Sequence, residues 1–162
     1  MRFEVEHHFA APPQAVQAAL ADPDFHRSLR LPDVGPPEVI EHTLGDNGVA
    51  VLVVRMTFTG HIDPILRRLI GGGPPVWLQR TTIETTGGRG HLDVTADGQG
   101  DRLRATADWR CEPTDDGCVR HLAGDLSIKL PLIGATAESK VLPGLLSRLD
   151  AEAAALTARL TC

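Results

Sequence analysis

The ionisable residue best placed to do chemistry is His7, because it interrupts an apolar face. Residues 2–9 alternate, which predicts a half-buried strand with Phe3, Val5, His7 and Phe9 on one side. A histidine in such surroundings can donate a hydrogen bond to a ligand carbonyl or act as a general base. It can equally be a core histidine that bonds to the backbone or to a neighbouring side chain. We therefore treat His7 and Phe9 as candidate ligand contacts.

Two arginines interrupt runs that otherwise predict apolar strands. Arg55 lies within residues 49–59 and Arg80 within residues 76–86. An inward guanidinium could hold the carboxylate or phosphate of an otherwise apolar ligand through two parallel hydrogen bonds. An outward guanidinium would belong to a solvated face instead. We keep Arg55 as a candidate ligand contact.

Neither a metal site nor a catalytic motif is indicated by the histidines and cysteines. His7 and His8 point to opposite faces of a strand, and Cys111, Cys118 and Cys162 form no CxxC pair. Motifs for a nucleophilic serine, a phosphate-binding loop and a dinucleotide site are lacking as well. We predict no catalytic residue, no metal ligand and no cofactor, and we expect the cysteines to be reduced.

Composition limits the class of protein. The chain has 162 residues, of which 42% are apolar and 23% are charged, and this fits one globular domain over residues 1–162. The chain has 16 Lys and Arg residues and 21 Asp and Glu residues, which gives a net charge of −5. It therefore lacks the excess of basic residues that is typical of a nucleic-acid binder. The chain shows neither an apolar run of membrane-spanning length nor a signal peptide, and we expect a cytoplasmic protein.

The order of elements predicts an α+β fold. A strand at 2–9 precedes two short helices, the second of which covers about residues 22–31. Further strands are predicted at 38–44, 49–59, 76–86, 90–96, 102–112 and 118–130, followed by a long helix at 136–160. Segregated helices and sequential hairpins indicate one antiparallel sheet of about six or seven strands. The sheet and the long helix must bury their apolar faces against each other.

Apolar positions supply most of the other candidate ligand contacts. The strand at 102–112 alternates most cleanly and turns Trp109 inward, and the strand at 118–130 places Leu126 and Ile128 on one face. The strand at 49–59 is apolar on both faces, so its inner face stays open. The remaining candidates are one further tryptophan and the stripe of the long helix, namely Trp77, Leu142, Leu145 and Leu149.

Residues 62–70 form a short amphipathic segment between glycines, which could act as a lid. Leu66 and Leu69 would then face the interior as ligand contacts, while Arg67 and Arg68 would lie outside. An open lid could touch a membrane surface transiently, as interfacial helices do. A fixed packing helix is the alternative.

Two stretches of the sequence resemble the START/polyketide-cyclase-like superfamily, also called SRPBCC. The opening FEVEHHFAAPPQAVQAALADPDFHRSL resembles its first strand and short helices, and GDLSIKLPLIGATAE resembles the strand-to-helix join of a bacterial branch of uncharacterised function. The matching residues of the join are Gly124, Leu126, Ile128, Leu130, Pro131, Leu132, Ile133, Gly134 and Glu138. The resemblance implies a helix-grip fold, in which a curved sheet wraps around a long C-terminal helix and leaves an elongated apolar cavity.

The resemblance also implies a range of functions, because relatives bind lipids, sterols, hormones or polyketides and a minority are enzymes. We expect a non-enzymatic carrier or sensor of a hydrophobic small molecule (lipid, sterol-like or polyketide-like), with His7 or an arginine fixing its orientation. One alternative is a cyclase- or hydratase-like enzyme that uses His7 as acid or base. Another is an interaction module with a filled interior. We expect a monomer or a homodimer.

Overall fold

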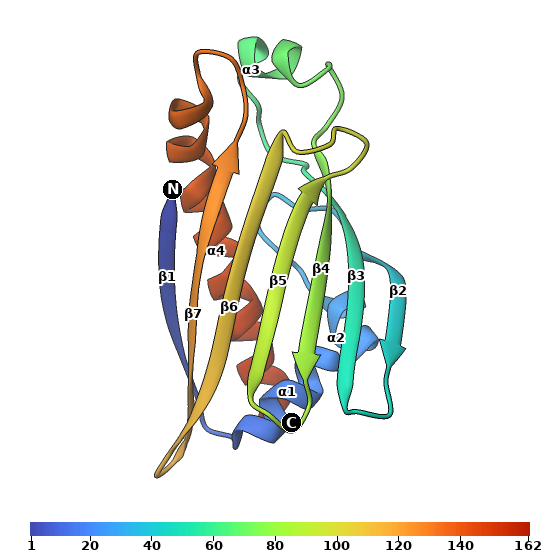
Figure 1. Cartoon of the computed structure of the whole chain (residues 1–162), viewed down its shortest axis with the longest axis vertical. Helices are drawn as coiled ribbons and strands as arrows, with labels where there is room; N and C mark the ends of the chain where they lie inside the picture. The colour runs from blue at the N-terminus through green and yellow to red at the C-terminus, as the bar shows by residue number, and fades with distance from the viewer.

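The computed structural model describes the backbone of residues 1–162 and every side chain except those of Ile65 and Leu69. Figure 1 shows the arrangement of its strands and helices. The strands are β1 (Arg2–Phe9), β2 (Glu38–Leu44), β3 (Val49–Thr57), β4 (Val76–Glu84), β5 (Arg89–Ala96), β6 (Leu103–Thr114) and β7 (Gly117–Ile128). The helices are α1 (Pro13–Ala21), α2 (Pro23–Ser28), α3 (Pro64–Leu69) and α4 (Gly134–Leu160).

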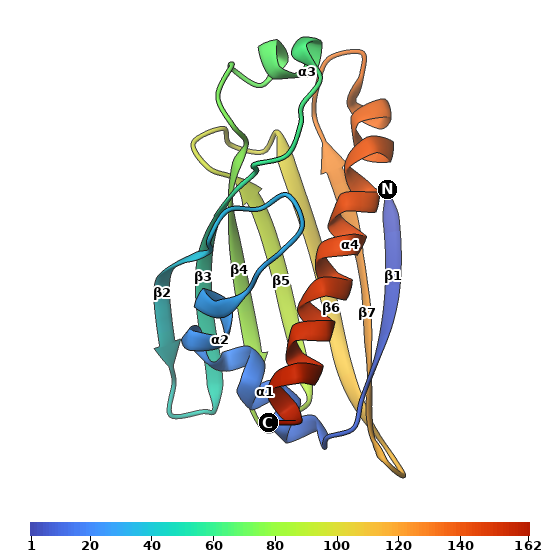
Figure 2. The same ribbon diagram turned by 180° about the vertical axis from the view of Figure 1, so that it is seen from behind.

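The strands of the described backbone form one seven-stranded antiparallel sheet in the order β1-β7-β6-β5-β4-β3-β2. Strands β2 to β7 pair with their neighbours in sequence, and β1 pairs with the other edge of β7. Figure 2 shows α4 crossing the concave side of this curved sheet, with α1 close to its last turns. The α+β architecture, the predicted strand number and the two short helices after the first strand are confirmed.

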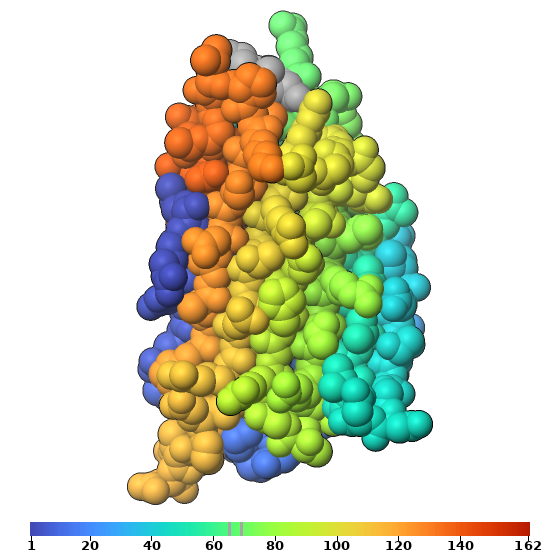
Figure 3. All heavy atoms as spheres, viewed as in Figure 1, coloured from blue at the N-terminus to red at the C-terminus, as the bar shows by residue number. Residues whose placement is uncertain are grey.

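The molecule has two distinct ends, which we call upper and lower as drawn in Figure 1. The upper end carries α3 and the first turns of α4, and the lower end carries the last turn of α4. The β6–β7 hairpin projects beyond the other strands at the lower end, as Figure 3 also shows. None of the described helices is long and apolar enough to span a bilayer.

The core lies between the concave face of the sheet and α4. One row of paired residues crosses six strands from β1 to β3, namely Phe3, Gly124, Ala107, Leu92, Thr81 and Leu52. Strand β3, whose inner face the sequence left open, turns Ala50, Leu52 and Val54 inward, and all of these are fully buried. The helix contributes Leu149 and Leu156 to the same core.

Tight contacts fix the join between β7 and α4. A Cβ at Gly124 would overlap the carbonyl oxygen of Thr106, and one at Gly134 would lie 2.5 Å from the carbonyl oxygen of Ile128. The Glu138 carboxylate accepts the backbone N–H of Ile128 at 3.0 Å. This hydrogen bond lowers the pKa of Glu138 below its usual value. These residues of the family-like join therefore hold the start of α4 against the end of β7.

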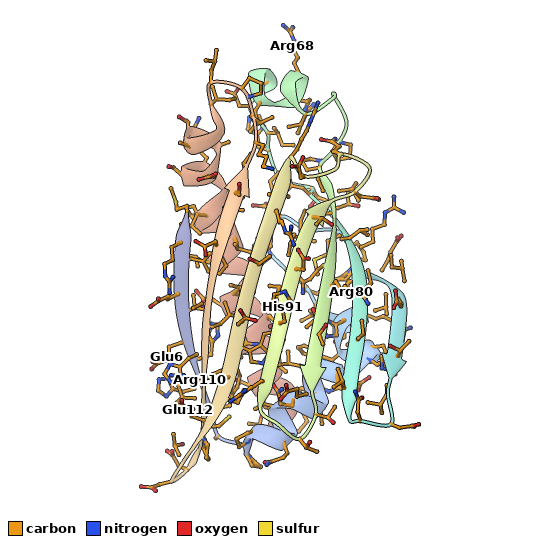
Figure 4. All side chains as sticks on the ribbon, in the orientation of Figure 1. Glu6, Arg68, Arg80, His91, Arg110 and Glu112 are labelled. Atoms are coloured by element: carbon orange, nitrogen blue, oxygen red, sulfur yellow. The ribbon has the colours of Figure 1, made fainter. Side chains whose placement is uncertain are left out.

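The convex face of the sheet carries charged side chains, among them Arg80 and His91 (Figure 4). His91 Nδ1 lies 2.7 Å from Asp108 Oδ1, and Arg80 Nη1 lies 3.6 Å from Glu41 Oε2. Exposed pairs of this kind contribute about 0–1 kcal/mol each. The convex face is exposed to solvent, and the Arg80 side chain lies on it.

The hydrogen bond between Ile128 and Glu138 predicts a pH-dependent contribution to stability. Because the pKa of Glu138 is lowered by folding, this contribution is present above the unfolded-state pKa and is lost as the pH falls through the folded-state pKa. We expect Glu138→Gln to lower the free energy of unfolding at about pH 7 and to differ less from wild type at about pH 3. Urea unfolding at both pH values measures the two differences, and a pH-independent difference would contradict the assignment.

Candidate functional site

Arg120 is a charged residue on the concave side of β7, and only 1% of it is exposed. Its Nη1 donates to Glu152 Oε1 of α4 at 3.0 Å, and its Nη2 donates to His7 Nδ1 of β1 at 3.1 Å. The guanidinium also lies 5.7 Å from the centre of the Phe9 ring. A buried guanidinium would be strongly destabilising without such partners. The cluster therefore links β1, β7 and α4.

His7 uses both of its ring nitrogens in this cluster. Because Nδ1 accepts from Arg120, the ring proton lies on Nε2, which donates to Asp150 Oδ1 of α4 at 2.9 Å. No ring lone pair is left to take a proton from a substrate. His7 thus bridges the sheet and the helix. This is the role of a core histidine that bonds to neighbouring side chains, which the sequence analysis gave as the alternative to a base or ligand contact.

A small internal cavity lies beside Arg120, between the sheet and α4. Its volume is about 10 Å³, which is room for one oxygen-sized group. We call it the inner cavity, and its walls include His26 of α2, Thr81 of β4, Trp109 of β6 and Leu149 of α4. Among the described side chains, the elongated apolar cavity that the family resemblance implies is reduced to this small space, whose walls include the large side chains of Trp109 and Leu149.

Three polar atoms in residues that line the inner cavity have no hydrogen-bond partner among the described residues: His26 Nδ1, Thr81 Oγ1 and Arg120 Nε. These residues are 1%, 4% and 1% exposed, respectively. His26 Nε2 donates to the Leu20 carbonyl at 2.6 Å, so the neutral ring keeps a lone pair on Nδ1. Each unpartnered buried polar group costs about 1–3 kcal/mol. Because all three residues line one cavity, we take this cavity as the candidate site.

Two other residues of the sheet that were predicted as ligand contacts, Trp109 and Leu126, are buried in the core. Trp109 Nε1 donates to Gln17 Oε1 at 3.0 Å, and Gln17 Nε2 donates in turn to the carbonyl oxygens of Glu84 and Arg89. Leu126 is 1% exposed. These interactions attach α1 to the sheet, so Trp109 presents an apolar ring to the inner cavity while its polar edge is occupied.

Most of the large apolar side chains on the first half of α4 are only partly buried. Four of them pack against the core and stay partly exposed, and we call these the upper patch: Val141, Leu142, Leu145 and Leu146. Ile128, at the end of β7, is partly buried in the same way. In the second half of α4, Leu149 and Leu156 are buried. The helix therefore seals the lower half of the concave face more completely than the upper half.

Arg148 lies between the upper patch and the sealed half of α4. Its guanidinium is 5.1 Å from the centre of the Trp77 ring and 5.7 Å from that of Phe58. Burial lowers the pKa of Arg148, and the nearby Asp33 acts in the opposite direction. The predicted contact Trp77 is thus covered by an arginine from the helix.

Three predicted contacts lie elsewhere. Arg55 faces outward from β3, where Nη2 lies 2.6 Å from Asp97 Oδ2, and this corrects its prediction as a ligand contact. The reason is that even-numbered residues of β3 face the core. Leu66 of α3 is partly buried, and the side chain of Leu69 lies outside the described residues. The lid and the membrane contact predicted for residues 62–70 stay predictions.

Several polar residues of the site were missed by the sequence analysis: Arg120, His26, Thr81 and Glu152. A signal existed for Arg120, which shares its strand face with Leu122 and Leu126. A signal also existed for Glu152, which follows Leu149 by three residues and so lies on the apolar stripe of the helix. No pattern in the sequence indicated that His26 and Thr81 would meet them.

An open groove of about 620 Å³ at the lower end is larger than the inner cavity. Its charged wall residues, Asp115 and Asp116, are exposed, and Cys111 reaches it from β6. Burial raises the pKa of Cys111 to about 12, so its thiol stays protonated and unreactive at neutral pH. Among the described residues, no three His, Cys, Asp or Glu side chains are grouped to hold a metal ion. The inner cavity is the better candidate site.

The buried pair of Arg120 and Glu152 predicts strong coupling in stability. We expect Arg120→Met to lower the free energy of unfolding by about 3 kcal/mol, because it leaves a largely buried carboxylate unpaired. The double variant Arg120→Met/Glu152→Met should recover at least about half of that loss, since it removes both charges. Urea unfolding of wild type, both single variants and the double variant measures this, and additive losses would contradict the coupling.

Solved structures of other proteins share this fold. TTHA0849 from Thermus thermophilus matches with a TM-score of 0.70 and 15% identity over 99% of this chain and 97% of that chain. The Zhui aromatase/cyclase from Streptomyces sp. R1128 matches with a TM-score of 0.64 and 18% identity over 99% and 94%. Ara h 8.0201 matches with a TM-score of 0.64 and 16% identity over 99% and 97%. These matches confirm the helix-grip fold that the sequence resemblance implied.

Among curated proteins, none matches the sequence. One family model matches residues 4–160, and its description is "Protein of unknown function (DUF2505)". Because this match spans nearly the whole chain, the protein belongs to the DUF2505 family.

Proposed function

We propose that this protein binds a hydrophobic small molecule between the first half of α4 and the sheet, without converting it chemically. The observation that carries the proposal is the upper patch, whose apolar side chains face the core side of the helix and yet stay partly exposed. Covering such surface contributes about 25 cal/mol per Å² of apolar area. A ligand under the upper patch would supply that cover.

The surroundings of the upper patch fit a site for an aromatic or aliphatic molecule. Such sites are mostly apolar, with a small number of polar groups that fix orientation. Trp77 and Phe58 supply aromatic surface under Arg148. The unpartnered polar atoms belong to residues of the inner cavity, whose wall includes Leu149, one helical turn beyond Leu145 of the upper patch.

Access to the site requires movement, because the interior is closed. The first half of α4 is the part that can move at the lower free-energy cost, since it buries less apolar surface than the second half. Pro143 lies within this half and has no N–H to donate to the preceding turn. Helix α3 stands at the same end of the molecule, and its Arg68 points away from the body (Figure 4). This arrangement suits a lid.

The proteins that share the fold support a ligand of this class. One of them is an aromatase/cyclase, so polyketide-like molecules join lipids and sterol-like compounds as candidates. That relative also favours an enzyme as a second candidate. We prefer a carrier, because His7 has both ring nitrogens engaged by Arg120 and Asp150 and is not free to act as a base.

A ligand-free interaction module is the other candidate, and the closed interior favours it. The inner cavity of about 10 Å³ holds no more than one oxygen-sized group. A module would keep this interior closed in solution, whereas a carrier would open it. Native mass spectrometry of freshly purified protein separates the two, because a reproducible apolar adduct supports the carrier.

The upper patch predicts where an apolar probe binds. We expect wild type to bind N-phenyl-1-naphthylamine with a rise in fluorescence, and Leu145→Gln to weaken binding at least about tenfold, because one leucine contact is replaced by a polar group. Ser147→Gln is the matched control, since Ser147 is exposed on the same helix turn and should bind as wild type does. Equal binding by all three proteins, or no binding by any of them, would contradict the proposed site.

The lid at α3 generates a separate prediction. We expect Leu66→Ser to slow the uptake of N-phenyl-1-naphthylamine several-fold in stopped-flow measurements while the melting temperature stays unchanged. Arg67→Ser is the control, because Arg67 is exposed on the same helix. A large drop in the melting temperature of Leu66→Ser would show instead that α3 is a fixed packing helix.

A further inference from the structure

We propose that the inner cavity recognises a hydroxyl group, so that the ligand is an elongated apolar molecule with a hydroxyl at its inner end. This inference rests on the proposed function and adds the chemical class of the ligand. The three polar atoms without partners among the described residues, in His26, Thr81 and Arg120, carry it. Each of these residues is more than nine-tenths buried, and all of them line the same cavity.

The hydrogen-bonding character of the three atoms is complementary to a hydroxyl. Arg120 Nε can only donate, because a guanidinium has no acceptor. His26 Nδ1 can only accept in the neutral ring, because its Nε2 proton is donated to the Leu20 carbonyl. A hydroxyl accepts from Arg120 and donates to His26 at the same time, and the Thr81 hydroxyl can take either role. A carbonyl or an ether would leave His26 Nδ1 unpartnered.

The size of the cavity agrees with this chemistry. A volume of about 10 Å³ fits one oxygen atom with its proton and excludes a carboxylate or a phosphate. Glu152 on the same wall already pairs with the Arg120 guanidinium, which leaves less positive charge to hold an anion. A ligand hydroxyl and a water molecule share this chemistry, and binding measurements can separate the two sources.

The spacing of residues along α4 and β4 places the cavity near the upper patch. Leu145 of the upper patch and Leu149 of the cavity wall are one helical turn apart, about 6 Å along α4. On the sheet, Trp77 and Thr81 lie four residues apart on the same face of β4, about 13 Å along the strand. A rod-shaped molecule could therefore pack against Trp77 and Leu145 while its terminal hydroxyl reaches Thr81.

The test compares rod-shaped probes that differ only at one end. The dissociation constants of trans-stilbene, 4-hydroxystilbene and 4-methoxystilbene are measured by displacement of N-phenyl-1-naphthylamine from wild type. We expect 4-hydroxystilbene to bind about tenfold more tightly than stilbene, because it completes the unpartnered hydrogen bonds. The methoxy compound can accept but cannot donate, and it should bind no better than stilbene.

Variants locate the recognition. Thr81→Val is nearly isosteric and should reduce the preference for 4-hydroxystilbene several-fold without weakening the binding of stilbene. Thr82→Val is the matched control, because Thr82 lies on the opposite face of β4 and should keep the full preference. A second readout needs no variant: the ¹⁵N shift of His26 Nδ1 should change when 4-hydroxystilbene binds and stay constant with 4-methoxystilbene.

The outcomes separate this inference from the function on which it rests. If stilbene and 4-hydroxystilbene bind equally well to wild type, the hydroxyl site is wrong and the proposed carrier stands. A crystal structure of the stilbene complex with an ordered water between His26 and Arg120 would then assign the cavity to that water. If no probe displaces N-phenyl-1-naphthylamine, or that probe itself does not bind, the proposed function fails together with the inference.

Discussion

The structure depends on one buried charge. Arg120 on β7 is held by Glu152 of α4, by His7 of β1 and by the ring of Phe9, so a buried ion pair joins the sheet to the long helix. A guanidinium taken out of water is stable only while these partners stay in place. The pair therefore fixes how α4 lies across the concave face, and the position of α4 determines how much of the interior is closed.

The same constraint divides the concave face into two halves. Below Arg148 the helix is tied down by the ion pair and by the buried Leu149 and Leu156. Above it, α4 is attached mainly at its start, through the hydrogen bond between Glu138 and Ile128, and its apolar side chains remain partly exposed. Opening of α4 between those points would leave both attachments in place. A closed interior and a ligand-binding function are compatible for this reason.

The family-like join illustrates how a recognisable motif can be structural. Gly124 and Gly134 leave room for close backbone contacts, and Glu138 accepts a backbone hydrogen bond at the end of β7. None of these contacts involves the inner cavity. The motif residues therefore hold the fold together, while the polar groups of the inner cavity come from α2, β4, β7 and the middle of α4. In this chain, the contacts that fix the join and the polar groups of the inner cavity come from different residues.

The sequence by itself determined the order of strands and helices, the antiparallel sheet and the long covering helix, because alternation and helical spacing are local properties. It also placed Trp109, Leu126 and Leu149 on inward faces. It could not decide the face of Arg55, since β3 is apolar on both sides, and it offered His7 as a possible base. Only the tertiary structure brought residues distant in the sequence together around Arg120 and the inner cavity, because those contacts depend on strand register and on where α4 crosses the sheet.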